Sequence, residues 1–98
     1  MYKNKRESII TKNLDDCYIC KNRASEMHHI FFGGNMKKSY RFKSEYYGLK
    51  LPLCRECHNK AHNDREFNYR LKRIGQRCFE KKLGTRKEFM TIFGKNYL

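Results

Sequence analysis

The sequence contains no tryptophan, only one proline, and far fewer acidic than basic residues. It also lacks a long apolar run: stretches such as 30–32 (Ile-Phe-Phe) fall far short of the roughly 20 residues that a membrane helix needs. We therefore expect a soluble protein with no membrane span. Because Pro52 stands alone and no repeat or low-complexity segment occurs, nothing marks an internal domain boundary. We expect a basic arm over 1–14 and one domain over 15–98.

The chain is too short and too polar to bury a large core. Its 98 residues are 39% hydrophobic and 34% charged, and domains of this kind usually need a metal, disulfides or oligomerisation for stability. The five cysteines are therefore the first feature to explain. Residues 1–12 carry charges where a secretory signal would be apolar. We expect the cytoplasm, a reducing compartment in which metal ligation is favoured over disulfides.

Four cysteines form two Cys-x-x-Cys pairs, Cys17 with Cys20 and Cys54 with Cys57. A two-residue gap lets both thiolates of a pair reach one tetrahedral Zn²⁺, and two pairs complete a closed site. The sequence therefore predicts a structural zinc, without which the chain should be largely unfolded. The alternative, four independent buried thiols, is disfavoured by the spacing. The remaining Cys78 lies on an apolar stripe and is predicted to be a packed core thiol.

All four histidines follow a cysteine pair: His28 and His29 come after the first, His58 and His62 after the second. A spacing of four places His58 and His62 on one helix face, where they can share a metal. Adjacent strand residues point to opposite sides, so only one of His28 and His29 can easily join that metal. Three nitrogens with open coordination positions are typical of a catalytic metal. Alternatively, these are ordinary surface or core histidines, or one replaces a cysteine at the zinc, which four cysteines already saturate.

The hydrophobic pattern predicts an α+β fold. Apolar residues favour strands over 27–32 and 49–53. Pro52 indicates that the second strand is short or lies at a sheet edge. Between them, residues 36–47 are expected to form a loop rich in lysine and tyrosine.

The region after the second cysteine pair is predicted to be helical, with a longer helix after Asp64. That helix carries an apolar stripe at three- and four-residue steps, formed by Phe67, Leu71, Ile74, Cys78 and Phe79. Gly75 disfavours an unbroken helix, and Gly84 is expected to be its C-cap. A last helix over about 86–93, with a Thr-x-x-Glu capping box and an end at Gly94, should pack against the stripe through Phe89, Ile92 and Phe93.

Basic residues dominate the charge. Lys and Arg number 23 and Asp and Glu number 10, a formal net charge of +13, or about +11 once four thiolates hold one Zn²⁺. This excess favours nucleic acid as a partner over a merely solvated surface. Candidate phosphate contacts in the expected loop are Lys37, Lys38, Arg41 and Lys43. The long helix adds cations that either follow the backbone or form a solvated face: Lys72, Arg73, Arg77, Lys81 and Lys82.

The order of these motifs resembles the HNH, or ββα-metal, endonucleases over roughly residues 15–65. The resemblance is carried by Cys17-x-x-Cys20, by His28-His29-Ile30 and by the run 51–62 (Leu-Pro-Leu-Cys-Arg-Glu-Cys-His-Asn-Lys-Ala-His). It implies a small zinc-stapled, treble-clef-like ββα-metal domain with additional C-terminal helices. The short chain and its last eleven residues resemble phage-type members, including the RecA-dependent recombination-enhancing nucleases. That likeness implies an infected host cytoplasm and a recombination-protein partner.

The resemblance also implies roles for the histidines. His29 corresponds to the general base that activates water, and the ligands of a catalytic divalent metal correspond to His28, His58 and His62. Imidazoles favour Zn²⁺, Ni²⁺, Co²⁺ or Mn²⁺ over Mg²⁺. The asparagine that opens the family's second strand is missing near Gly48, and Asn35 or Asn59 is its stand-in.

The sequence therefore predicts a metal-dependent endonuclease that hydrolyses DNA phosphodiester bonds. Two other classes of protein remain. A zinc module that binds nucleic acid without cutting it would account for the cysteines and the charge, but not for the grouped histidines. A zinc-stapled protein-interaction domain is the third reading.

Overall fold

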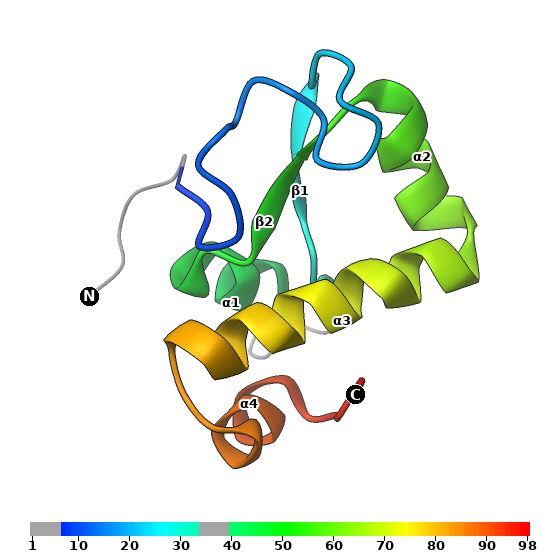
Figure 1. Cartoon of the computed structure of the whole chain (residues 1–98). Coiled ribbons are helices and arrows are strands. Elements are labelled where there is room, and N and C mark those ends of the chain that lie inside the picture. Colours follow the sequence, from blue (N-terminus) through cyan, green and yellow to red (C-terminus); the bar gives the residue numbers. More distant parts are fainter. Residues whose placement is uncertain (1–6, 34–39) are drawn as a thin grey trace.

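The computed structural model describes residues 7–33 and 40–98, which form a two-stranded sheet and four helices. The elements are β1 (Glu26–His29), α1 (Tyr40–Tyr47), β2 (Lys50–Leu53), α2 (Arg55–Asn63), α3 (Arg65–Lys82) and α4 (Arg86–Phe93). In Figure 1 the two strands stand above α3, which crosses beneath them, and α4 lies below α3. The α+β class is as predicted. No helix of the described segments is long and apolar enough to cross a membrane.

The sheet is an antiparallel pair in which His29 lies opposite Lys50. The strand predicted over 27–32 is shorter than expected and ends at His29. The reason lies two residues later, where the amide of Phe31 donates to Ser44 Oγ at 2.9 Å instead of to a strand partner. The chain there turns into the core, and the side chain of Phe31 is buried.

Helix α1 corrects the prediction of a loop over 36–47 for residues 40–47; residues 36–39 lie outside the described part of the chain. Ser44 is fully buried, and its hydroxyl also donates to the carbonyl of Phe31 at 2.7 Å. The rings of Tyr40 and Tyr47 each lie 6.2 Å from the ring of Phe93. Contacts on one side of the segment thus stabilise a helix that its polar composition does not favour.

Helices α2 and α3 meet at Asp64, which ends the first and caps the second by accepting from the amide of Phe67 at 3.1 Å. Gly75 does not break α3, contrary to expectation. A Cβ added there would lie 3.1 Å from the side chain of Phe31 and 3.2 Å from that of Ile30. The glycine therefore permits a close approach of the helix to the segment that follows β1.

The last helix is capped at both ends as predicted. Thr85 and Glu88 form the capping box, and Gly94 ends the helix in the left-handed conformation with φ 76°. The C-cap of α3 was predicted at Gly84, but Leu83 occupies it in a right-handed conformation. The amides of Leu83 and Gly84 both donate to the carbonyl of Phe79 in the last turn. No residue in the left-handed conformation is therefore needed to end the helix.

The aromatic core forms where α3 and α4 face each other. The ring of Phe89 lies 5.4 Å from those of Phe79 and Phe31. Phe93 is also buried, and Ile92 is partly buried against the same cluster. The predicted packing of the last helix on the apolar stripe is therefore confirmed.

The described part of the N-terminal arm packs along the domain. Ser8 Oγ donates to the carbonyl of Lys50 at 2.6 Å, and the amide of Ile9 donates to the carbonyl of Gly48 at 2.9 Å. The side chains of Ile9 and Ile10 contact the core. The arm thus covers the outer edge of β2.

Candidate functional site

The two cysteine pairs come together in one cluster. The sulfur atoms of Cys17, Cys20, Cys54 and Cys57 all lie within 4.8 Å of one another. A turn closes the first pair, because the amide of Lys21, with φ 71°, donates to the carbonyl of Cys17 at 3.0 Å. In the second pair, Cys54 caps α2 and its sulfur accepts from the amide of Cys57 at 3.4 Å. This predicted four-sulfur cluster could hold a metal ion such as zinc.

The backbone favours the thiolate form at one cysteine of the cluster, Cys17. Burial raises the pKa of Cys17, but amide groups of Cys20, Cys54 and Ile19 outweigh it and lower that pKa to about 6. The pKa of Cys57 is raised by burial and by the neighbouring thiols. Since zinc binds the thiolate form, the amides stabilise the species that a metal needs.

Three histidines form a second cluster, separate from the cysteines. The side-chain nitrogens of His28, His58 and His62 lie within 4.8 Å of one another, and the Nε2 atoms of His58 and His62 are 3.2 Å apart. His28 is 1% exposed, and its Nε2 has no hydrogen-bond partner among the described residues. A buried nitrogen without a partner is costly, and a metal ligated there would satisfy it.

The buried histidine of this cluster is held in the neutral form that can bind a cation. Burial lowers the pKa of His28 to about 3, with further lowering by His58 and His62. The imidazole is therefore neutral at physiological pH, as metal ligation requires. His58 Nδ1 forms a hydrogen-bond contact with the carboxylate of Glu26 on β1. This contact leaves the Nε2 of His58 directed at His62.

His29 points to the other side of β1, as predicted for adjacent strand residues. Its Nε2 lies 2.8 Å from Glu45 Oε1 on α1, and the same oxygen lies 3.2 Å from the Nζ of Lys50. Lys50 is fully buried. Burial raises the pKa of Glu45, but the hydrogen bonds from His29 and Lys50 outweigh it and the net pKa falls below the ordinary value. An ionised Glu45 only accepts hydrogen bonds, so it holds a proton on His29 Nε2, and Nδ1 is the unprotonated nitrogen of the neutral ring.

The sequence reasoning missed Glu26, Glu45 and Lys50. A lysine between Leu49 and Leu51 in a predicted strand is a signal that could have drawn attention to a buried charge. Nothing in the local sequence indicates either glutamate, because each meets its histidine across a long stretch of chain, 16 residues for Glu45 and 32 for Glu26.

All four histidines border one pocket of about 330 Å³, which Met27, Phe32 and Arg41 also line. Of the predicted phosphate contacts, Arg41 is thus at the site, and its charge contributes to the lowered pKa of His29 after burial, the main cause. Lys43 is not at the site. Its Nζ donates to the carbonyl of Ile92 at 2.6 Å, because α1 turns that side chain toward α4.

Lys37, Lys38 and Asn35 lie outside the described residues. Asn59 is exposed on α2, and its carbonyl accepts from the side chain of Asn63 at 2.8 Å. The group that contacts His29 is therefore Glu45 rather than this asparagine. Cys78 belongs to neither cluster: it is half-buried and donates to the carbonyl of Ile9 at 3.2 Å.

In comparisons with protein-family models, with curated proteins and with solved structures, nothing matches the chain.

Proposed function

We propose that the chain is a metal-dependent endonuclease of the HNH type that hydrolyses DNA phosphodiester bonds. The observation that carries the proposal is the meeting of all four histidines at one pocket, three as a ligand set and the fourth held by a carboxylate. Strand β1 supplies His28 and His29, and helix α2, which directly follows β2, supplies His58 and His62. This is the order of elements in a ββα-metal domain.

The three-histidine cluster fits a divalent ion. His28 from the strand and His58 and His62 from one helix face offer three nitrogens, which leaves coordination positions open for substrate. Imidazole donors suit Zn²⁺, Ni²⁺, Co²⁺ or Mn²⁺ better than Mg²⁺. Such an ion would neutralise the negative charge that grows on the phosphate and the leaving oxygen during hydrolysis.

His29 acts as the general base in this proposal. Its pKa is lowered from 6.5, mainly by burial, so the ring is largely neutral at pH 7 and can accept a proton. Glu45 holds the Nε2 proton and fixes the ring, and Nδ1 takes a proton from the water that attacks phosphorus. Arg41, exposed at the pocket rim, can contact the phosphate whose bond is broken.

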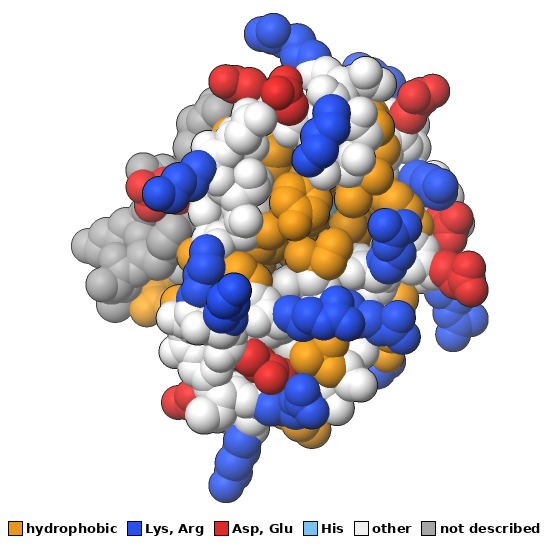
Figure 2. Space-filling model, viewed as in Figure 1, with side chains coloured by type: hydrophobic (Ala, Val, Ile, Leu, Met, Phe, Trp, Pro, Cys, Tyr) orange, Lys and Arg blue, Asp and Glu red, His pale blue; other side chains and the backbone are white. Residues whose placement is uncertain are grey.

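The charge of the protein supports DNA as the substrate. The formal net charge is +13, and Figure 2 shows lysine and arginine side chains gathered over α3 on one face. A surface of this kind binds the phosphate backbone with little regard to sequence. The four-cysteine cluster would hold a structural zinc, which would join the turn after Cys17 to the start of α2.

Nicking of supercoiled plasmid with a series of divalent ions tests the proposal. The parent protein should convert the plasmid to open circles with at least one of Zn²⁺, Ni²⁺, Co²⁺, Mn²⁺ and Mg²⁺, and His29→Ala should not. Asn59→Ala, an exposed change on α2, is the matched control. If the parent binds DNA but cuts with none of these ions, the chain is a non-cutting nucleic-acid-binding zinc module instead.

A further inference from the structure

Three cations lie against aromatic rings where α3 meets the C-terminal tail. The Nζ atoms of Lys72 and Lys95 lie 5.4 and 5.2 Å from the ring centroid of Tyr97. The guanidinium carbon of Arg73 lies 4.6 Å from the ring of Tyr69. Aromatic faces attract cations at these distances. We refer to these five residues as the tail cluster.

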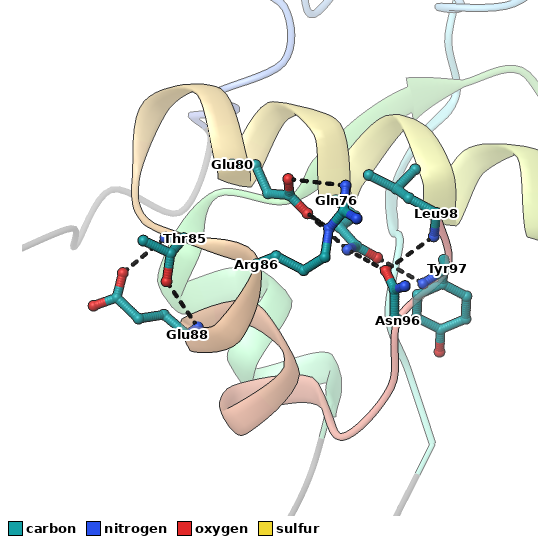
Figure 3. A network of polar contacts seen from close by, with 8 residues as sticks. All are labelled: Gln76, Glu80, Thr85, Arg86, Glu88, Asn96, Tyr97 and Leu98. Carbon is teal, nitrogen blue, oxygen red and sulfur yellow. Dashed lines mark hydrogen bonds and ion pairs between the residues drawn. The ribbon is translucent and has the colours of Figure 1, made fainter.

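A buried amide fixes the tail against α3 (Figure 3). Gln76 is fully buried; its Oε1 accepts from the amide of Tyr97 at 2.7 Å and its Nε2 donates to Asn96 Oδ1 at 2.8 Å. The same Nε2 lies 2.8 Å from Glu80 Oε2, which also accepts from Arg86 Nε at 3.0 Å. These hydrogen bonds hold Asn96 and the backbone of Tyr97 against α3.

Among the described residues, the two lysines of the tail cluster, Lys72 and Lys95, contact no acidic side chain as an ion pair. Lys72 is partly buried, and burial followed by the positive charge of Lys95 lowers its pKa. Like charges held close together in partly desolvated surroundings repel each other, and an anion between them relieves that repulsion.

Phe32 connects the tail cluster to the histidine pocket. The Nζ of Lys72 lies 5.7 Å from the ring of Phe32, and that ring lies 4.9 Å from the ring of His62. Phe32 and His62 both line the pocket. A polyanion with one phosphate at the histidines can therefore pass Phe32 and reach Lys72.

We propose that Lys72 and Lys95 form a phosphate-binding site for the nucleic-acid strand that extends from the histidine pocket. The ligand is a backbone phosphodiester, because lysine contacts to phosphate position a strand without reading its bases. The location of the strand rests on the proposed function, but its binding can be measured without cleavage.

The test compares two double variants that remove the same charge. Lys72→Met with Lys95→Met changes the tail cluster while keeping the packing of the aliphatic stems. Lys12→Met with Lys87→Met changes exposed lysines in the N-terminal arm and on α4. Affinity for a fluorescein-labelled DNA oligonucleotide is measured by anisotropy over a salt series, without added divalent ion, and the oligonucleotide is recovered to show that it is intact.

We expect the tail-cluster variant to bind roughly tenfold more weakly at low salt, with a slope of log K against log salt that is smaller by about two. The control variant should change affinity by less than about twofold. Equal losses in both variants would overturn the proposal, because general charge would then explain the effect. Circular dichroism checks the fold, and if the double variant unfolds, Lys95→Met is compared with Lys87→Met.

Two further comparisons distinguish the phosphate site from the proposed nuclease activity and from lipid binding. If the parent never cuts DNA but the difference in affinity remains, the nuclease proposal fails and the phosphate site stands. If the parent cuts and the tail-cluster variant binds like the control, the phosphate site fails alone. The second comparison measures binding to phosphatidylserine vesicles. A tail-cluster variant that loses vesicle binding and keeps DNA binding would assign the cluster to a lipid surface and overturn the proposal.

Discussion

His29 and Glu45 meet through a 2.8 Å contact between Nε2 and Oε1, although one residue ends β1 and the other lies in α1. The contact fixes the ring orientation and the position of its proton, two properties that a general base needs. His28, one residue earlier, instead joins His58 and His62. The alternation of side chains along a single strand thus separates the proposed base from the proposed ligand set.

Replacement of His29 by alanine should abolish the base and leave the metal site intact. Cleavage should fall by roughly 10²- to 10⁴-fold, the usual contribution of general-base catalysis, while DNA affinity stays near that of the parent. Raising the metal concentration should not restore activity. Single-turnover cleavage together with anisotropy measures both quantities, and parental activity in His29→Ala would exclude His29 as the base.

Glu45→Gln should move the pH profile of cleavage. Burial lowers the pKa of His29, and the hydrogen bond and charge of Glu45 oppose that shift. The rate should rise with pH as His29 loses its proton, with the midpoint below 6.5. Without the carboxylate charge the pKa of His29 falls further, so the midpoint of the pH–rate profile moves to lower pH. The maximal rate at high pH should drop about tenfold, because an imidazole of lower pKa is a weaker base. Glu66→Gln is the control, and an unchanged profile would show that Glu45 does not tune the base.

His58→Ala or His62→Ala should lower the occupancy of the catalytic metal. Each variant removes one of three ligands, so part of the lost cleavage should return at high metal concentration. This rescue distinguishes the pair from His29→Ala. Calorimetric titration with Ni²⁺, on protein whose cysteine cluster holds zinc, gives the affinity directly. Equal Ni²⁺ affinity in parent and both variants would contradict the ligand assignment.

Glu26→Gln should weaken metal binding without removing a ligand. The carboxylate orients His58 through its Nδ1, and loss of such an outer contact typically costs 10- to 100-fold in metal affinity. The same Ni²⁺ titration measures the effect. Glu56→Gln, also exposed and on the helix that carries His58, should leave the affinity unchanged, and a similar loss in both variants would argue for a general charge effect.

Cys57→Ser should remove the structural zinc and most of the fold. A Cys₄ zinc supplies on the order of 10 kcal/mol at neutral pH, which is comparable to the whole stability of a small domain. Zinc content and helical circular dichroism are measured with and without a strong chelator. Cys78→Ser, outside the cluster, should keep both. A chelated parent with undiminished helical signal would show that the metal is not structural.

The features that could be predicted from the sequence depend on neighbours a few residues apart. The Cys-x-x-Cys spacing indicated the metal cluster, and the four-residue step from His58 to His62 placed both rings on one helix face. Caps at Thr85 and Gly94 were equally local. Helical and strand geometry repeats every few residues, so such short spacings carry reliable spatial meaning.

Contacts between distant segments could not be read in this way. Helix α1 forms because Ser44 and its neighbours meet Phe31 and Phe93, and the same helix turns Lys43 away from the pocket. Glu45, Glu26 and the tail cluster reach their partners across many residues of chain. Their geometry depends on how α1, β1, α3 and the C-terminal tail pack together, because a side chain's partners across the core are set by packing rather than by its place in the sequence.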